Sequence, residues 1–459
     1  MRPLMLEQVA RWCGARLLGV DLQVVAVCTD SRAVVPGSLF VALKGERFDG
    51  HEHAVAAVEA GAAAVLVQRR LDLTAPQLLC ADTQAALGDL AAGIARGRPA
   101  TVLALTGSNG KTTVKTLLAS ILAGVGPTHA NPGNRNNEIG LPLAVIEAPE
   151  DARFAIYEMG AGKPGDIAYL TAIARPDIAL VNNIGPAHLE RMGTLAGIAE
   201  TKGAIYEALP ADGTAVINAD DAFCEVFARR AAGRRIIRFG LEGGADVRAL
   251  APRLAAESTA FVLRTPAGEV AVELPLPGEH NLRNALAAAA MALAAGATPA
   301  QIAAGLGEAR PVAGRQVVHA IGDDVRLIDD SYNANPASVA AAIDTLAKAG
   351  GEGWLVLGDM GELGPSAELL HAEVGDRARR AGLSRVFTIG TLSRAASRAF
   401  GDGGEHFQDQ AALVAALRER LAPGVRCLVK GSRSAGMERV VKALLETNGD
   451  QGEASGHAA

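Results

Sequence analysis

The stretch LTGSNGKTTV, from Leu105 to Val114, contains residue types that bind phosphate. In the usual pattern G-x-x-x-x-G-K-[ST], backbone amides surround the phosphates, the lysine reaches the terminal phosphate groups and the hydroxyl holds magnesium. Gly110, Lys111 and Thr112 supply the second half of this pattern, but Leu105 stands where the first glycine is expected. A strand-like run precedes the loop and a helix-like run follows it. This order favours a nucleotide-phosphate site at a helix N-terminus over an incidental glycine turn.

Two further polar residues could complete a magnesium site near this loop. Glu158 in IYEMGAG and His188 in NNIGPAHLERMG each follow a strand-like run. The carboxyl ends of neighbouring parallel strands line one crevice, so both side chains can converge on a bound phosphate. An exposed carboxylate and a hydrogen-bonded histidine are the alternatives when each residue is taken alone. Together with the loop, the two residues favour a metal site.

The composition describes a globular protein that acts on small molecules. A chain of 459 residues exceeds one ordinary core, and about 150 residues per domain predicts about three domains. The net charge of −6 provides no basic field for nucleic acid or anionic lipid. MRPLMLEQVARWC has no apolar signal-peptide core, and the five cysteines show no C-x-x-C spacing. We therefore expect a cytoplasmic protein with neither a zinc site nor a disulfide framework.

The elements that must position these residues follow the rhythm of parallel α/β sheets. Strands are predicted at 101–106, 154–159, 177–184, 354–358, 385–390 and 426–431, and helices at 111–124 and 285–297. Pro- and Gly-containing breaks at 95–100 and 307–315 divide the chain. We predict an α/β fold with domains at 1–98, 99–312 and 313–446, followed by a disordered tail at 447–459.

The chain resembles the Mur ligases, a family of ATP-dependent, amide-forming enzymes of peptidoglycan precursor synthesis. The loop T-G-S-N-G-K-T-T matches the family pattern T-G-x-N-G-K-T, so the missing glycine at Leu105 is a family trait. The resemblance covers nearly the whole folded chain. It implies a UDP-binding N-terminal α/β domain, a central P-loop-like parallel-sheet ATPase domain and a C-terminal Rossmann-like α/β domain.

The resemblance also implies ligands for ATP and for two Mg²⁺ ions. The implied ATP-binding residues are Gly107, Ser108, Asn109, Gly110, Lys111, Thr112, Thr113, Asn281, Asn284, Arg315 and Asp330. The implied magnesium ligands are Thr112, Glu158, His188 and Lys202, and the implied catalytic residues are Lys111, His188 and Lys202. In this family the lysine at the position of Lys202 is modified to a carbamate, which offers Mg²⁺ an oxygen ligand. The alternative for Lys202 is an ordinary solvated helix lysine.

DDSYNANPAS, LGDMGELG and LVKGSRSAGME resemble the family member that adds D-alanyl-D-alanine to UDP-N-acetylmuramoyl-tripeptide. The implied substrate contacts are Ser31, Arg32, Lys44, Gly45 and Asp49 for UDP, Asn136 and Asn137 for the muramoyl group, and Asn333, Asn335 and Ser338 for the dipeptide. Either Asn136 or Asn137 fits the muramoyl contact. Turn formation explains the Asn and Ser residues of NANPAS equally well.

Three other functions stay open. The preceding Mur ligase adds the third amino acid, but the D-N-P-R signature usual for it is absent. A P-loop switch or kinase would share Lys111 and Thr112 but would not need His188 and Lys202. A non-catalytic nucleotide-binding protein would not need the polar catalytic positions. For the ligase we expect a monomer, with no nucleic-acid or membrane partner.

Overall fold

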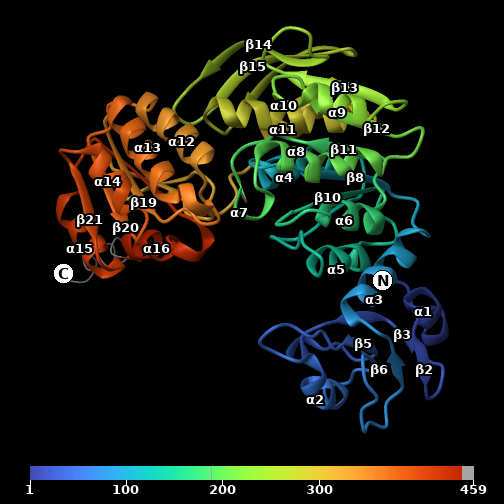
Figure 1. Ribbon diagram of the computed structural model, residues 1–459. Helices are drawn as coiled ribbons and strands as arrows, with labels where there is room; N and C mark the ends of the chain where they lie inside the picture. The colour runs from blue at the N-terminus through green and yellow to red at the C-terminus, as the bar shows by residue number, and fades with distance from the viewer. Residues whose placement is uncertain (188, 447–459) are drawn as a thin grey trace, which may run out of the picture.

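In the computed structural model, which describes residues 1–187 and 189–446, the chain forms three large sheets flanked by helices (Figure 1). This is the predicted α/β organisation. The predicted boundaries after residues 98 and 312 fall between the sheets but stay predictions. His188 and the predicted disordered tail at 447–459 lie outside the described residues. None of the described helices is long and apolar enough to span a membrane.

The N-terminal domain contains a five-stranded sheet. Its strand order is β2 (Arg16–Leu18), β7 (Gln77–Leu79), β6 (Ala64–Val67), β5 (Ser38–Val41) and β4 (Ala26–Cys28), with a separate pair β1 (Leu4–Met5) and β3 (Gln23–Val24). The helices are α1 (Leu6–Cys13), α2 (Ala54–Glu59) and α3 (Thr83–Ala95). Only β2 in the larger sheet runs antiparallel to its neighbour.

The middle domain is built on a nine-stranded sheet. Its strand order is β16 (Gly268–Leu274), β15 (Thr259–Thr265), β14 (Val247–Leu254), β13 (Arg235–Gly240), β12 (Thr214–Asn218), β11 (Ile178–Val181), β8 (Thr101–Thr106), β10 (Phe154–Glu158) and β9 (Thr128–Ala130). The helices are α4 (Lys111–Ala123), α5 (Gly140–Glu147), α6 (Asp166–Ala174), α7 (Leu189–Met192), α8 (Leu195–Glu207), α9 (Cys224–Arg230), α10 (Glu279–Ala294) and α11 (Pro299–Gly307).

The middle sheet differs from the predicted all-parallel arrangement at one end. From β9 to β14 in this strand order, neighbouring strands pair parallel. Strand β15, in contrast, pairs antiparallel with both β14 and β16. The two hairpin connections are short, and antiparallel neighbours need only such turns, whereas a parallel pair needs a long crossover. The predicted strands β8, β10 and β11 lie side by side, so their carboxyl ends meet at one edge.

The C-terminal domain has a six-stranded sheet. Its strand order is β17 (Val317–Ala320), β18 (Arg326–Asp330), β22 (Val425–Lys430), β19 (Glu352–Gly358), β20 (Arg385–Ile389) and β21 (Gly404–Phe407). The helices are α12 (Pro336–Lys348), α13 (Ala367–Arg380), α14 (Arg394–Phe400), α15 (Gln410–Arg420) and α16 (Glu438–Glu446). Only β17 is antiparallel. The doubly wound sheet therefore matches the Rossmann-like expectation.

Small residues allow the helices behind the phosphate loop to pack closely. The alanine-rich run is fully buried from Ala285 to Ala292, whereas Leu293 and Ala294 at the end of α10 are half-buried, and α10 and α11 pack with α4 in one hydrophobic core. In α11, Gly305 faces the backbone of Ile121 in α4, and its carbonyl accepts a hydrogen bond from Ser120 Oγ at 2.7 Å. The position of α4 thus depends on a close helix contact.

Replacing Gly305 by alanine should destabilise the middle domain, because the new Cβ would lie 2.4 Å from Ile121 Cα. We expect urea denaturation to show a loss of about 1–3 kcal/mol in the free energy of unfolding, as overpacked cores do. Gly307→Ala is the matched control on the same helix, since its nearest neighbour would be 3.6 Å away. Equal stability of the two variants would contradict this packing.

Candidate functional site

The phosphate loop is short because β8 extends further than the usual pattern allows. Leu105 is a fully buried strand residue, and the loop consists only of residues 107–110. Gly107 and Gly110 have φ values of +151° and +78°, conformations that glycine adopts without strain. Gly110 is the N-cap of α4, so the amides of the first helical turn face the open end of the loop.

Two asparagines crowd the turn at Gly110. A Cβ on Gly110 would lie 2.2 Å from Asn284 Oδ1 and 2.7 Å from Asn182 Nδ2. Asn182 Nδ2 donates to Asn284 Oδ1 at 3.1 Å and to Asn109 O at 2.9 Å. The predicted base-binding residue Asn284 is therefore in direct contact with the loop. Asn281 lies one turn away in α10, where its Nδ2 donates to Pro277 O at 2.8 Å.

Lys111 is the first residue of α4, and its side chain folds back to contact the loop. Its Nζ donates to Gly107 O at 2.7 Å and to Ser108 O at 3.4 Å. Desolvation of the amine lowers the pKa of Lys111, and although the Glu158 carboxylate opposes this, the Arg315 guanidinium adds to it. The Arg315 cation cannot offset the desolvation of Lys111. An anion bound at the loop would offset it and would stabilise the ammonium form of Lys111.

Glu158 ends β10 directly beside the loop and is only 2% exposed. Its Oε1 accepts a hydrogen bond from Asn136 Nδ2, and its Oε2 accepts one from Thr112 Oγ1, both at 2.8 Å. Burial opposes ionisation of this carboxyl. The charges of Lys115 and Lys111, together with these hydrogen bonds, nevertheless hold the pKa of Glu158 below its usual value.

Lys115 is a site residue that sequence reasoning missed. It lies one turn after Lys111 in α4, and its ammonium is 3.3 Å from Glu158 Oε2. The same Nζ donates to Asn131 O and Gly133 O, both at 2.9 Å. All three donors of the ammonium are thereby used. The signal in the sequence is weak, because a lysine spaced four residues from Lys111 also suits a solvated helix face.

Lys202 in α8 is fully buried, which excludes the solvated-lysine alternative. Its Nζ has no hydrogen-bond partner among the described residues. Burial and the charge of Lys111 lower the pKa of Lys202 well below its usual value, although Asp166 acts in the opposite direction. The side chain is therefore a buried amine whose charged form is disfavoured. Its predicted partner His188 lies outside the described residues.

A cavity of about 640 Å³ lies between the middle and C-terminal domains. The predicted residues that line it are Ser108, Asn109, Gly110, Lys111, Thr112, Thr113, Asn136, Asn137, Glu158, Asn281, Asn284, Arg315, Asp330, Asn333, Asn335 and Ser338. Gly107 and Lys202 are not part of its lining, although both lie next to residues that are. One cavity thus collects residues from two domains.

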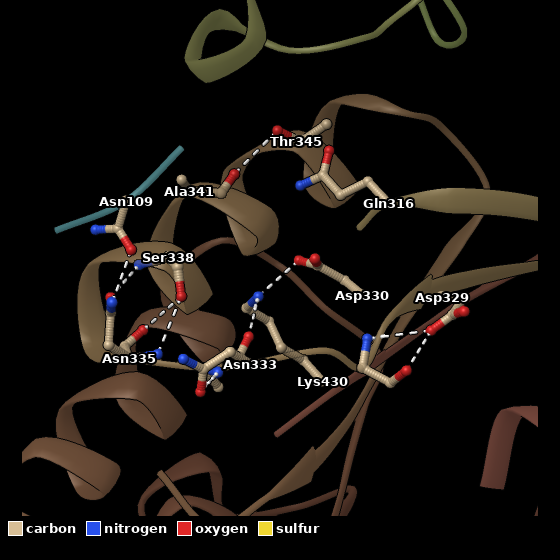
Figure 2. A network of polar contacts seen from close by, with 12 residues as sticks. Asn109, Gln316, Asp329, Asp330, Asn333, Asn335, Ser338, Ala341, Thr345 and Lys430 are labelled. Atoms are coloured by element: carbon tan, nitrogen blue, oxygen red, sulfur yellow. Dashed lines mark hydrogen bonds and ion pairs between the residues drawn. The ribbon is translucent and has the colours of Figure 1, made fainter. Parts of the chain in front are cut away.

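Arg315 and Asp330 bring the C-terminal domain to the phosphate loop. Arg315 Nη2 donates to Thr112 Oγ1 at 2.8 Å, and its guanidinium lies 4.4 Å from the ring centroid of Tyr332. Asp330 forms a buried ion pair with Lys430, with 2.7 Å between Oδ2 and Nζ (Figure 2). Tyr332 and Lys430 line the cavity but were not predicted, although both stand in motifs that the sequence analysis quoted.

The three predicted dipeptide contacts lie at the start of α12. Asn335 is the N-cap of this helix and forms a capping box with Ser338, so both side chains also have a local structural role, although as a helix cap and not as the turn considered from the sequence. Asn333 is exposed, and its Oδ1 accepts only from the amide of Ala334 among its described contacts. Of the three side chains, that of Asn333 has the most capacity left for a ligand.

Asn136 and Asn137 both line the cavity but differ in their partners. Asn136 contacts Glu158, whereas Asn137 Oδ1 accepts from Gly140 N at 2.8 Å and holds the turn before α5. Of the two, only Asn136 therefore directs its side chain to the Glu158 carboxylate.

The predicted UDP contacts lie in the N-terminal domain and do not line the cavity. Ser31 and Arg32 lie in a short 3-10 helix, where Arg32 pairs with Asp30 at 2.7 Å. Lys44 and Asp49 form a β-bridge around the turn at Gly45. The Asp49 carboxylate is occupied by His51 and Arg69, so it holds this loop in place.

Asparagines that follow β11 and β12 were also missed. Asn183 Oδ1 accepts from the amide of Asn109 at 2.8 Å, and Asn218 Nδ2 donates to Asn182 O at 2.9 Å. All three asparagines line the cavity. The signal that could have found them is a polar residue at the carboxyl end of an apolar parallel strand.

Three family models match this sequence. The model described as "Mur ligase middle domain" matches residues 105–292, and "Mur ligase, glutamate ligase domain" matches 314–433. The model described as "Mur ligase family, catalytic domain" matches 23–94. The three ranges correspond to the three large sheets.

Whole-length relatives agree with these matches. The UDP-N-acetylmuramoyl-tripeptide--D-alanyl-D-alanine ligase of Escherichia coli is 45% identical over 444 residues, which cover 96% of this chain and 98% of that protein. The crystal structure of MurF from Acinetobacter baumannii has a TM-score of 0.92 at 35% identity, with 97% and 99% of the two chains covered. MurF ligase from Thermotoga maritima in complex with ADP has a TM-score of 0.82 at 30% identity, with 93% and 98% covered. The three-domain fold is thereby confirmed.

Replacing Lys115 by methionine should leave Glu158 buried without its ion-pair partner. We expect the free energy of unfolding in urea to fall by about 3–5 kcal/mol, because an uncompensated charge remains in the interior. Lys442→Met, at an exposed pair with Glu446, is the control and should change stability by less than about 0.5 kcal/mol. The double variant Lys115→Met/Glu158→Gln should recover part of the loss. A Lys115→Met protein as stable as the Lys442→Met protein would refute the buried pair.

Proposed function

The chain belongs to the Mur ligase family, and from this premise we propose that it joins D-alanyl-D-alanine to UDP-N-acetylmuramoyl-tripeptide at the expense of ATP. The products are the UDP-linked pentapeptide, ADP and phosphate. The name of the Escherichia coli relative, which matches nearly the whole of this chain, supports the choice of both substrates. The ADP in the Thermotoga maritima structure supports the nucleotide.

The observation that carries this proposal is the composition of the cavity. It is lined on one side by the phosphate loop and Glu158, and on the other by Asp330 and the NANPAS segment. A switch or kinase needs the first group but has no use for a second domain with its own set of polar residues. A ligase must bring an activated carboxylate and an amine together, which requires both.

Activation of the carboxylate needs ATP because oxide is too poor a leaving group. Phosphoryl transfer from ATP gives an acyl phosphate, the dipeptide amine attacks the acyl carbon, and phosphate leaves. The chain contributes position and charge: the amides of the first turn of α4 and the Lys111 ammonium bind the phosphates and stabilise the transferring group. The open N-terminus of α4 and the position of Lys111 Nζ against the loop support this role.

Magnesium fits the residues beside the loop. Among the described residues, no three His, Cys, Asp or Glu side chains gather around one point, so other oxygen donors are required. Thr112 and Glu158 supply two of them. Lys202 supplies a further one as a carbamate: its buried amine has no partner within the described chain and its pKa is depressed, so the neutral form that reacts with carbon dioxide is favoured. We assign His188 to the same site by family resemblance. When bound, Mg²⁺ neutralises phosphate charge and aligns the phosphate with the carboxylate.

The remaining substrate groups are assigned to residues of all three domains. Asn281 and Asn284 suit the adenine base, and Asp330, held by Lys430, suits the ribose. Asn136 suits the muramoyl group, and the N-terminal segments around Arg32 and Lys44 suit UDP. Arg315 links the two domains across the phosphate loop, and its contact with Thr112 supports a hinge at which closure excludes water.

Other assignments follow from the substrates. ATP and UDP-linked precursors are cytoplasmic metabolites, which supports a cytoplasmic enzyme. The rival assignment, the ligase for the third amino acid, lacks support from the NANPAS and KGSRS motifs.

Replacing Lys202 by alanine should abolish ligation, and a short carboxylic acid should restore part of it by supplying the missing oxygen ligand. The unchanged chain should also show a carbamate signal in carbon-13 NMR after incubation with labelled bicarbonate, which the variant should lack. Glu200→Ala on the exposed side of the same helix is the control. Absence of both the rescue and the carbamate signal would exclude the modified lysine.

The decisive assay measures phosphate release from ATP and Mg²⁺ with UDP-N-acetylmuramoyl-tripeptide, with and without D-alanyl-D-alanine, and product masses. We expect dipeptide-dependent release and a UDP-linked pentapeptide. Lys111→Ala should lower the rate on the order of 10²-fold or more, since it removes a charge at the transferring phosphoryl group. Release that requires a diamino acid and UDP-N-acetylmuramoyl-dipeptide would instead identify the preceding ligase, and release that ignores every amine would overturn both assignments.

A further inference from the structure

Besides the contact of Arg315 with Thr112, one further side-chain hydrogen bond joins the phosphate loop to the C-terminal domain. Asn335 Nδ2 donates to Asn109 Oδ1 at 2.7 Å, although the two residues are separated by 226 positions in the chain. Figure 2 shows this contact at the first turn of α12, next to the pair of Lys430 and Asp330. This hydrogen bond connects the proposed ATP site in one domain with the proposed dipeptide site in the other.

Both polar atoms of the Asn335 side chain form hydrogen bonds within the protein. Its Oδ1 accepts from the amide of Ser338 at 2.9 Å, and this bond completes the N-terminal cap of α12. Ser338 Oγ in turn accepts from the Asn335 amide at 3.0 Å. The oxygen accepts the cap bond and one of the two Nδ2 hydrogens is used for Asn109, so the side chain has less capacity left for a dipeptide than that of Asn333. These contacts therefore favour a role in positioning other groups.

The phosphate loop is held firmly on its other side. The backbone of Asn109 is bound at its amide by Asn183 Oδ1 at 2.8 Å and at its carbonyl by Asn182 Nδ2 at 2.9 Å. These contacts leave the Asn109 side chain to face α12. A shift of the loop on nucleotide binding would therefore move the Asn109 side chain, and Asn335 would move with it.

The segment that Asn335 ends is also fixed at its beginning. Lys430 Nζ binds Asp330 Oδ2 at 2.7 Å and Asn333 O at 3.1 Å, so the residues between β18 and α12 are tied at both ends (Figure 2). Asn333, whose side chain is exposed, lies between the two anchors. Movement of Asn335 would thus move Asn333 together with the first turn of α12.

We propose that Asn335 is a positioning residue that transmits nucleotide occupancy of the phosphate loop, through Asn109, to the dipeptide-binding segment around Asn333. The inference rests on the proposed function, since it assumes that the C-terminal domain binds the dipeptide. It adds an ordering rule: bound nucleotide improves dipeptide binding, and by linkage bound dipeptide improves nucleotide binding to the same extent.

The test uses variants that break the link but keep the cap. Asn335→Ser retains a good N-cap residue but is too short to reach Asn109, and Asn109→Ala removes the other partner. At saturating ATP and tripeptide, each should raise the KM for D-alanyl-D-alanine about threefold to tenfold, the worth of one neutral hydrogen bond, with a smaller change in kcat. The double variant should be no worse than the worse single variant. The control is Asp409→Ser at the N-cap of α15 in the same domain, where KM should not change.

Hydrogen exchange gives a readout that does not need turnover. In the unchanged chain, a non-hydrolysable ATP analogue with Mg²⁺ should slow amide exchange in the first turn of α12, and this protection should disappear in Asn335→Ser and Asn109→Ala. Effects on KM that multiply in the double variant, or nucleotide protection that persists in both single variants, would overturn the link. Failure of the unchanged chain to release phosphate with the dipeptide would instead refute the proposed function, and the exchange result would then decide the link alone.

Discussion

The buried ion pair between Glu158 and Lys115 is the interaction on which the site depends. A carboxylate that is only 2% exposed is costly unless it is paired and hydrogen-bonded, and here the ammonium, a hydroxyl and an amide share that task. The partners come from the strand β10, the helix α4 and the segment before α5. The pair therefore fixes α4 relative to β10 and to the segment before α5. The pair also holds the charged Glu158 carboxylate beside the loop before any substrate is bound.

The second constraint is that the catalytic cavity is divided between two domains. In the proposed function the middle domain holds the nucleotide through the loop and Asn284, while the C-terminal domain contributes Asp330 and the start of α12 to the cavity. Only a few polar contacts join the two halves at the loop, among them Arg315 to Thr112 and Asn335 to Asn109. Such contacts exchange easily for contacts with a ligand, because each contributes only about 1 kcal/mol. The proposed acyl phosphate would benefit from this arrangement if the domains open for substrates and exclude water on closure.

Sequence reasoning located the strands that carry the site because apolar strands with polar residues at their carboxyl ends leave a clear local pattern. It missed the antiparallel strands β14 to β16, whose outward-facing residues are polar and whose signal resembles that of loops. It also named Asn335 as a dipeptide contact, which stays a prediction, but it did not foresee that this side chain caps α12 and contacts Asn109. Both outcomes depend on neighbours that are distant in the chain, which a local pattern does not contain.

By itself the sequence determined the phosphate loop, the order of the three domains and the family, because these reside in contiguous motifs whose chemistry is local. Lys111 and Thr112 follow a glycine turn between a strand and a helix, and no distant residue is needed to interpret them. Only the tertiary structure decided which lysines are buried and with what partners. Lys115, Lys202 and Lys430 are alike in sequence, but one neutralises Glu158, one is an unpaired amine within the described chain and one holds Asp330. The physical reason is that the cost of burying a charge, and the partner that offsets it, are set by the surroundings in space and not by the spacing along the chain.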